Sequence, residues 1–339
     1  MVGPGLLGKT GSLVRPLLAS GKCAVIADAN VVALFGDKVC TSLKAAGFTP
    51  ELLPVEGGEG AKSMSQAAYL CEQMNAAGLD RTSFVVSLGG GVLLDLAGFV
   101  AAIYYRGIPY VSVPTTFLAQ VDSCIGGKTG VNSSAGKNLI GAFHHPALVV
   151  ADTDTLRTLP GRIWNEGFAE AIKHAVIRDA ELFESIEKVD PDELAPFVER
   201  NIRIKAEIVA ADEREQTETR SLLNFGHTIG HAIEYAAGYG NLLHGEAISL
   251  GMVASAQVST RRAGLSLGEA EKIKCALQAH QLPVVLPPDF PREKIFEALP
   301  RDKKFEQGRI RFVVAHALGR ASVSTEVTME DLRAAVDAL

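Results

Sequence analysis

The chain has 339 residues, 47% hydrophobic and 21% charged, which is typical of a soluble globular protein with more than one core. Its net charge of −6 argues against a general nucleic-acid binder, which would need a basic face. The five cysteines form no C-x-x-C pair and residues 1–11 lack the apolar segment of a secretory signal, so we expect a cytoplasmic protein with free thiols. The longest apolar run, 93–105, is interrupted by Asp95 and Gly98, so we expect no membrane-spanning segment.

The first half of the chain alternates short apolar runs with helical stretches. Strands are predicted at 23–27, 51–55, 84–88 and 110–114, and helices at 31–46, at 63–77 and from 92 onward. This alternation predicts βαβ units and a mostly parallel, Rossmann-like sheet, with ligands at the carboxyl ends of its strands.

The second half reads as mainly helical. Helices are predicted at 162–178, 192–211, 222–237, 246–263 and 266–280, the last beginning with the capping box Ser266-Leu-Gly-Glu269. A small hairpin is predicted within 309–324. We therefore expect an α/β domain at 1–151 and a mainly helical domain at 152–339.

Several polar groups follow the predicted strands of the first domain. Gly89-Gly-Gly91 separates a strand from a helix, where backbone N–H groups can bind a pyrophosphate, although the turn is not a G-x-G-x-x-G fingerprint. Asp28 and Asn30 follow the first strand, and Glu59 and Lys62 follow the second. Glycine-rich turns are common, so this pattern is a weak signal by itself.

The stretch 121–129 is also rich in glycine. Gly127-Lys-Thr129 is not a P-loop, because Asp122 stands where that motif needs glycine. The density of polar side chains nevertheless favours a ligand-binding loop over a solvated surface loop. These side chains are Thr115, Thr116, Asp122, Lys128, Lys137 and Asn138.

A histidine-rich stretch organises the second domain. His227 and His231 are four residues apart and share one helix face, and a turn at 238–241 leads to His244. Such convergence is typical of a divalent metal site, but for an isolated H-x-x-x-H pair an exposed polar helix face explains the spacing equally well. Arg220 and Asn224 lie one predicted helical turn earlier, so they could line the same cavity.

A third group lies on the predicted helix 162–178. Glu170, Lys173 and His174 share one face, and Glu170 stands in an otherwise apolar run. A carboxylate on a buried face needs a partner, and a metal ion is one. Taken alone, this helix would favour an ordinary Glu–Lys surface pair.

Taken together, these motifs resemble the 3-dehydroquinate synthase family of sugar-phosphate cyclases over nearly the whole chain. The matching stretches are Gly89–Gly98, Pro114–Thr116, Gln120–Thr129, Gly136–Asn138, Ala169–Lys173, Leu223–His231 and Leu243–Glu246. The resemblance implies an N-terminal NAD-binding domain and a helical C-terminal domain that binds a divalent metal, Zn²⁺ or Co²⁺. It also implies conversion of 3-deoxy-D-arabino-heptulosonate 7-phosphate, a phosphorylated sugar acid, to 3-dehydroquinate and phosphate in the shikimate pathway, by a lyase that is commonly a homodimer.

The resemblance assigns roles residue by residue. The implied metal ligands are Glu170, His227 and His244, so that His231 becomes an acid–base group beside the phosphate. The implied NAD contacts are Asp28, Asn30, Glu59, Lys62, Gly90, Gly91, Asp95, Thr115, Thr116 and Lys137. The implied substrate groups are Lys205 and Arg220 for the carboxylate, Arg106, Lys128, Asn138, Asn224 and Lys304 around the phosphate, and Asp122 and Lys173 for hydroxyls, with Glu215 as a proton acceptor. His231, Lys173, Lys128, Glu215, Asn138 and Arg220 form the implied catalytic set.

Two other enzyme activities fit part of this pattern. Another sugar-phosphate cyclase of the same fold would act on a substrate without a carboxylate, which argues against it because Lys205 and Arg220 are present. A metal-dependent polyol dehydrogenase would not need so many anion-binding groups. A non-catalytic sensor would not require Glu170, His227 and His244 together.

Overall fold

The computed structural model describes residues 1–18, 21–134, 136–190, 192–238, 240–299, 305–306 and 309–339. The chain divides into two compact units, which we describe separately. Unit 1 comprises Met1–Leu159 and Leu194–Ile202, and unit 2 comprises Pro160–Glu193 and Arg203–Leu339. No helix in the described part of the chain is both long and apolar enough to cross a membrane.

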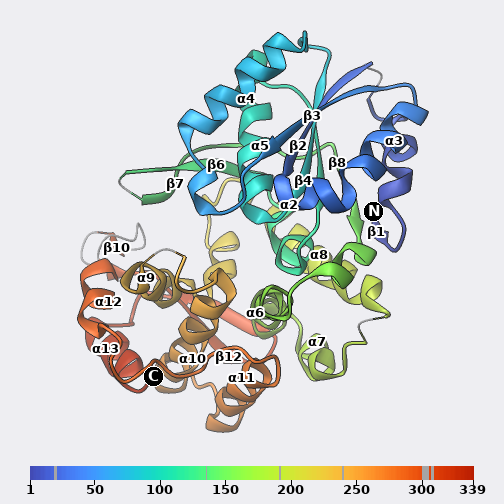
Figure 1. The fold of residues 1–339 in the computed structure, drawn as a ribbon. Helices are drawn as coiled ribbons and strands as arrows, with labels where there is room; N and C mark the ends of the chain where they lie inside the picture. Colours follow the sequence, from blue (N-terminus) through green and yellow to red (C-terminus); the bar gives the residue numbers. More distant parts are fainter. Residues whose placement is uncertain (19–20, 135, 191, 239, 300–304, 307–308) are drawn as a thin grey trace. The chain divides into compact units, whose positions relative to one another are not determined.

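Unit 1 is built on a five-stranded parallel sheet in the order β3-β2-β4-β5-β8 (Figure 1). Its strands are β2 (Lys22–Asp28), β3 (Thr49–Val55), β4 (Phe84–Gly89), β5 (Tyr110–Pro114) and β8 (Leu148–Val149). The four predicted strands are therefore present, and the predicted α/β class of the first domain is confirmed. A short parallel pair, β1 (Val2–Gly3) and β9 (Ala151–Asp152), lies outside this sheet.

Helices cover both faces of the sheet because alternate strand residues point to opposite sides. In β2, Ala24 and Ile26 join a core with α4 and α5, whereas Cys23 and Val25 join a core with α1 and α3. The helices are α1 (Thr10–Val14), α2 (Ala29–Val31), α3 (Asp37–Ala45), α4 (Met64–Ala76) and α5 (Gly91–Ile103). A π-helical turn at Val32–Gly36 joins α2 to α3, so the helix predicted over 31–46 is present in segments.

A long hairpin in unit 1 did not follow from the sequence pattern. Strands β6 (Lys128–Ser133) and β7 (Gly136–Phe143) pair antiparallel, where we expected a glycine-rich loop. Most of β7 is exposed, so it lacks the hydrophobic alternation that would mark a strand.

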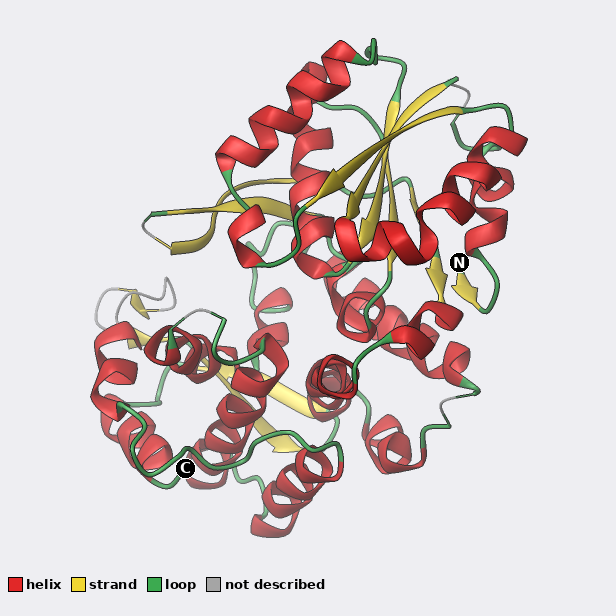
Figure 2. Cartoon of the chain, in the orientation of Figure 1, coloured by secondary structure: helices red, strands yellow, loops and turns green. Residues whose placement is uncertain are grey.

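Unit 2 is mainly helical, as predicted, and contains a hairpin of six- and five-residue strands (Figure 2). Its helices are α6 (Gly161–Arg178), α7 (Ala180–Ser185), the C-terminal part of α8 (Leu194–Ala211), α9 (His227–Ala237), α10 (His244–Arg262), α11 (Leu267–Ala279), α12 (Arg292–Ala298) and α13 (Met329–Asp337). The strands are β12 (Phe312–Ala317) and β13 (Arg320–Ser324), with the short pair β10 (Phe305–Glu306) and β11 (Arg309–Ile310) before them. The capping box at Ser266 is present as predicted.

Helix α10 is the centre of unit 2. It packs against α6, α9, α11, α13 and β12, and its residues from Ala247 to Ala256 are buried. Close approach to α9 requires glycine, because a Cβ at Gly251 would overlap the carbonyl oxygen of Gly226 and crowd Gly230. This crossing fixes how the two helices present their first residues.

The predicted first residue of one helix is wrong. The helix expected over 222–237 begins only at His227, and Arg220–Asn224 forms a separate 3₁₀ turn. Gly226 lies between them with φ +81°, a left-handed conformation that breaks the helix. Arg220 and Asn224 therefore do not precede the histidines on one continuous helix. The predicted start of the next helix is also late, because α10 begins at His244.

Candidate active site

Three residues predicted as metal ligands converge in unit 2. Glu170 lies in the middle of α6, and His227 and His244 are the first residues of α9 and α10. The Oε1 atom of Glu170 is 3.3 Å from Nε2 of His227 and 3.4 Å from Nε2 of His244. One potential ligand atom from each residue lies within 4.8 Å of the others. We call these three residues the Glu-His-His cluster.

Contacts at Nδ1 orient both imidazole rings so that Nε2 faces Glu170. Nδ1 of His227 lies 3.1 Å from the carbonyl oxygen of Phe225, and this nitrogen must carry the proton to donate there. Nδ1 of His244 lies 3.7 Å from Oε2 of the buried Glu234 on α9. In both rings Nε2 therefore faces the cluster, and a neutral ring whose Nδ1 donates to its neighbour would offer the Nε2 lone pair that a metal ligand requires.

The carboxylate of Glu170 is only 1% exposed and ion-pairs with Lys173, which is 2% exposed. Burial would raise the pKa of Glu170, but Lys173 and His227 outweigh burial and hold this pKa well below its usual range. Within the described residues, neither carboxylate oxygen makes a hydrogen bond of good geometry. The ionised, buried carboxylate of Glu170 and the two imidazole nitrogens that face it fit a divalent cation, whose binding would displace the proton that His244 shares with Glu170 and Glu234.

The pKa values of the two histidines shift in opposite directions. Burial lowers the pKa of His227, although Glu170 opposes this effect. Burial would also lower the pKa of His244, but the carboxylates of Glu170 and Glu234 outweigh it and raise the pKa to about 10. Nearby, burial raises the pKa of Glu166 to about 7.

His231 lies beside this cluster. Its ring centroid is 5.3 Å from that of His227 and 5.9 Å from that of His244, and the residue is exposed. The group of donor atoms described above does not include it. The simple H-x-x-x-H chelate that the spacing alone suggests is therefore not formed.

The other predicted groups of unit 2 lie on α8 and the loop after it. Lys205 is buried on α8, and the buried Arg220 donates to the carbonyl oxygen of Glu213. Asp212 accepts hydrogen bonds from the backbone N–H groups of residues 216, 217 and 220, which shapes the loop. Asn224 donates to Glu215 across 3.3 Å, and Glu215 has a left-handed backbone with φ +56°. Lys304 lies outside the described residues.

In unit 1, polar side chains from the loop after β3, from α5 and from the β6–β7 hairpin lie together. Lys62 is 4% exposed, and its Nζ atom lies 2.5 Å from Oδ2 of Asp95 and also contacts Oδ1 of Asn138. Glu59 accepts a 2.7 Å hydrogen bond from Asn132 and lies 3.7 Å from the ammonium of Lys137. We call these six residues the Lys62 network.

The remaining unit 1 residues occupy turns and caps. Asp28 caps α2 by accepting from the backbone of Asn30 at 2.8 Å, and Thr116 accepts from the backbone of Ala119 at 3.2 Å. At the start of α5 a Cβ on Gly90 would crowd the side chain of Thr116, and one on Gly91 would clash with that of Ser123, so this turn needs glycine. Among the other predicted groups, Thr115 is buried, Asp122 is half-buried in a π-helical turn, Lys128 is exposed at the start of β6, and Arg106 is exposed with φ +67°.

Sequence reasoning missed two residues and one ion pair. Glu234 was detectable, because it lies seven residues after His227 and so on the same face of α9. Asn132 carried no spacing signal. The pair Arg162–Glu246, which joins the start of α6 to the start of α10 through contacts of 2.6 and 2.7 Å, links segments too distant in sequence to be matched.

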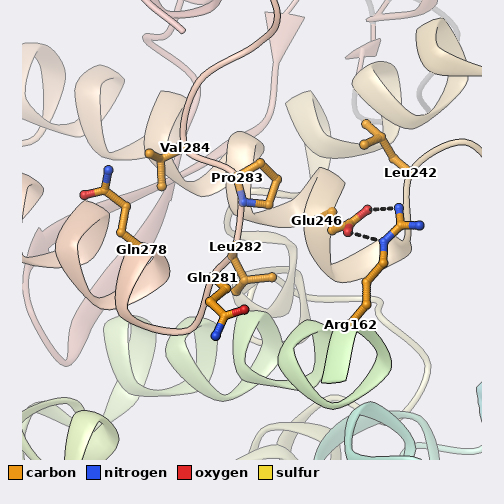
Figure 3. Close-up of a pocket in the computed structure, with 8 residues that line it drawn as sticks. All are labelled: Arg162, Leu242, Glu246, Gln278, Gln281, Leu282, Pro283 and Val284. Atoms are coloured by element: carbon orange, nitrogen blue, oxygen red, sulfur yellow. Dashed lines mark hydrogen bonds and ion pairs between the residues drawn. The ribbon is translucent and has the colours of Figure 1, made fainter. Parts of the chain in front are cut away.

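Arg162 and Glu246 form one wall of a surface pocket of about 610 Å³ (Figure 3). The other lining residues are Leu242, Gln278, Gln281, Leu282, Pro283 and Val284. Because these two side chains satisfy each other, the pocket wall presents little free charge. The pocket contains none of the Glu-His-His cluster.

Comparisons with known proteins agree with the geometry. The family described as 3-dehydroquinate synthase N-terminal matches residues 52–166, and the family described as 3-dehydroquinate synthase C-terminal matches residues 167–305. The chain is 46% identical to a 3-dehydroquinate synthase of Symbiobacterium thermophilum, covering 100% of this chain and 96% of that protein. It is 43% identical to the one of Thermodesulfovibrio yellowstonii, covering 98% and 94%.

Solved structures show the same fold. A 2-epi-5-epi-valiolone synthase of Streptomyces hygroscopicus, with NAD⁺ and Zn²⁺ bound, has a TM-score of 0.89 at 30% identity and covers 99% of this chain and 94% of that one. A 2-deoxy-scyllo-inosose synthase complexed with carbaglucose-6-phosphate, NAD⁺ and Co²⁺ has a TM-score of 0.89 at 27% identity, covering 98% and 95%. The chain is more similar in sequence to these 3-dehydroquinate synthases than to the two other cyclases, so the alternative cyclase and dehydrogenase activities are not favoured. The chain thus belongs to the 3-dehydroquinate synthase family, with the lyase activity of that family.

Proposed function

We propose that this chain converts 3-deoxy-D-arabino-heptulosonate 7-phosphate to 3-dehydroquinate and phosphate, using NAD catalytically together with one divalent metal ion. The observation that carries the proposal is the Glu-His-His cluster in a chain of this family. The activity places the chain in the shikimate pathway of aromatic amino acid biosynthesis.

Glu170, His227 and His244 would hold the metal ion. Three protein ligands leave positions open, which is typical of a catalytic site, and imidazole with carboxylate suits both Zn²⁺ and Co²⁺. When bound, the ion would supply Lewis acidity toward substrate hydroxyl groups. Lys173 already contacts Glu170, so it is placed to bind a substrate hydroxyl beside the same ligand.

Residues 1–151 would form the NAD-binding domain and residues 152–339 the metal- and substrate-binding domain. When bound, NAD would supply reversible hydride acceptance. The start of α5 offers backbone N–H groups at a glycine turn that can approach a pyrophosphate. The proposed NAD contacts are Asp28, Asn30, Glu59, Lys62, Gly90, Gly91, Asp95, Thr115, Thr116 and Lys137.

The substrate carries a carboxylate and a phosphate, so it needs cationic and amide partners in an otherwise acidic protein. Lys205 and Arg220 are proposed for the carboxylate, and His231 is proposed to transfer a proton beside the phosphate. The remaining proposed substrate groups are Arg106, Asp122, Lys128, Asn138, Lys173, Asn224 and Lys304, and Glu215 is the proposed proton acceptor.

We further propose that the protein is a cytoplasmic homodimer. The exposed Arg106, held in a left-handed turn, would then be available to the phosphate site of the partner. Sedimentation at assay concentration should show the dimer. A fully active monomer would exclude this role for Arg106.

The decisive assay follows phosphate release while the absorbance of NADH is monitored. We expect phosphate release that needs NAD yet leaves no net NADH, because the cofactor is regenerated in each turnover. A polyol dehydrogenase would accumulate NADH, and another cyclase would turn over substrates without the carboxylate. Chelator treatment should abolish activity, and Zn²⁺ or Co²⁺ should restore it.

The roles of the histidines can be separated by metal content. His231→Ala should lower turnover by ~10²-fold or more, as expected for a lost acid–base group, while retaining the metal. His227→Ala should lose the metal. Equal metal loss in both variants would make His231 a ligand and contradict the assignment.

A further inference from the structure

Asn132 occupies an irregular position in the β6–β7 hairpin. The register of the two strands shifts between Val131 and Ser133, so Asn132 is not paired with a residue of β7 in the backbone ladder. Its backbone N–H instead donates to the carbonyl oxygen of Lys62 at 2.8 Å, beside a parallel bridge to Ser63. Such a bulge re-aims a side chain.

The side chain of Asn132 uses both ends of its amide. Nδ2 donates to Oε1 of Glu59 at 2.7 Å, and Oδ1 accepts from the backbone N–H of Asn138 at 2.9 Å. Asn138 has φ +57°, a left-handed conformation that this hydrogen bond supports. A carboxylate at position 132 would lack the donor, and an apolar side chain would lack both functions.

The contacts of Asn132 join the two halves of the Lys62 network. On one side, Glu59 lies near Lys137, and on the other, Lys62 connects Asn138 to Asp95. Without Asn132, Glu59 would be a half-exposed carboxylate on a short loop. Among the described residues, its ion pair with Lys137 at 3.7 Å would be the side-chain contact that remains. Removing the amide would leave Glu59 free to rotate.

We propose that Asn132 is a positioning residue that preorganises Glu59 for binding a nicotinamide dinucleotide, while it holds the backbone of Asn138, a proposed substrate group, in its left-handed conformation. It acts by fixing the rotamer of Glu59 before the ligand arrives, which removes an ordering cost from binding. The inference rests on the proposed function, because it takes Glu59 as an NAD contact.

The test measures NAD binding by calorimetry on the full chain. Asn132→Ala should raise the Kd for NAD by roughly 10-fold, equivalent to about 1.4 kcal/mol. Because Asn132 acts through Glu59, Asn132→Ala introduced into the Glu59→Ala variant should raise the Kd for NAD by less than about twofold. Ser133→Ala is the matched control, because Ser133 lies in the same hairpin and does not contact Glu59; its Kd should match the wild type.

If Asn132→Ala folds poorly, Asn132→Asp provides a second test, since it keeps the acceptor for Asn138 but loses the donor to Glu59. It should also weaken NAD binding. An unchanged Kd in a folded Asn132 variant, an equal loss in both Glu59 backgrounds, or the same loss in Ser133→Ala overturns the inference. A wild-type chain that binds no NAD would instead contradict the proposed function.

Discussion

Replacing Lys173 by methionine separates the structural role of this lysine from its proposed role toward substrate. The Lys173–Glu170 pair is buried, with side chains 2% and 1% exposed. Removing one partner of a buried pair leaves an uncompensated charge, at a cost of about 3–5 kcal/mol. We therefore expect Lys173→Met to destabilise the metal-free protein by about 3 kcal/mol.

A bound metal ion changes this expectation, because the cation compensates Glu170 in place of the lysine. In the metal-loaded protein the loss should fall to about 1 kcal/mol. By linkage, the difference of about 2 kcal/mol must appear as tighter metal binding, roughly 30-fold. The variant should thus bind the metal more tightly while losing activity.

The chain offers a convenient probe, since its single tryptophan, Trp164, lies on α6 with Glu170 and packs edge-to-face on Phe168. Urea unfolding followed by its fluorescence, with and without metal, gives both stabilities, and competition with a chromophoric chelator gives the affinity. Lys272→Met is the control: its pair with Glu184 is exposed, so we expect about 1 kcal/mol or less in both forms. Equal losses for Lys173→Met in both forms, or weaker metal binding, would refute the reasoning.

Three further substitutions test other parts of unit 2. Arg162→Ala should cost about 1 kcal/mol or less in urea unfolding, because the Arg162 side chain is 59% exposed, although that of Glu246 is only 14% exposed, and Arg162→Lys should not restore the two-point contact. Burial lowers the pKa of His280 to about 4, so as the pH falls the unfolded chain takes up a proton at this residue before the folded chain does. The free energy of unfolding should therefore fall by roughly 2–3 kcal/mol between about pH 6.5 and pH 4. His280→Gln should reduce this pH dependence in unfolding curves measured across that range. Gly245→Ala would drive a methyl group into a backbone carbonyl of α6, so metal affinity should fall by about tenfold or more in chelator competition, whereas Gly268→Ala, with open space around it, should leave the affinity unchanged.

The parallel sheet could be predicted because its strands are short apolar runs separated by amphipathic helices. The hairpin β12–β13 and the capping box of α11 also have local signals, and both are present. The β6–β7 hairpin has none, since it projects exposed side chains such as Leu139 and Phe143. Its existence depends on contacts with α5 and the loop after β3, which lie far away in sequence.

The site shows the same division between local and distant information. The spacing of His227 and His231 indicated a polar helix face, but it could not decide which histidine faces a carboxylate. That choice follows from the left-handed Gly226, which makes His227 the first residue of α9, and from the crossing of α9 with α10. The residues alone grouped His227 with His231 and His244 and left Glu170 as a separate candidate, so the family resemblance was needed to replace His231 by Glu170 in the ligand set.

The identity of the three ligand residues does not by itself explain why the Glu-His-His cluster converges; the glycines at the helix crossings are also needed. His244 reaches Glu170 because Gly245 lets the backbone of α10 lie directly against Glu166, one turn before Glu170 on α6. His227 reaches it because Gly226 and Gly251 allow α9 and α10 to approach. Metal–ligand distances vary by only about 0.2 Å in a working site. A methyl group added at one of these glycines would push the helices apart and so separate the ligand atoms, although the ligand residues themselves are unchanged. The capacity to hold a cation is therefore encoded as much by glycines at the helix crossings as by the glutamate and the two histidines.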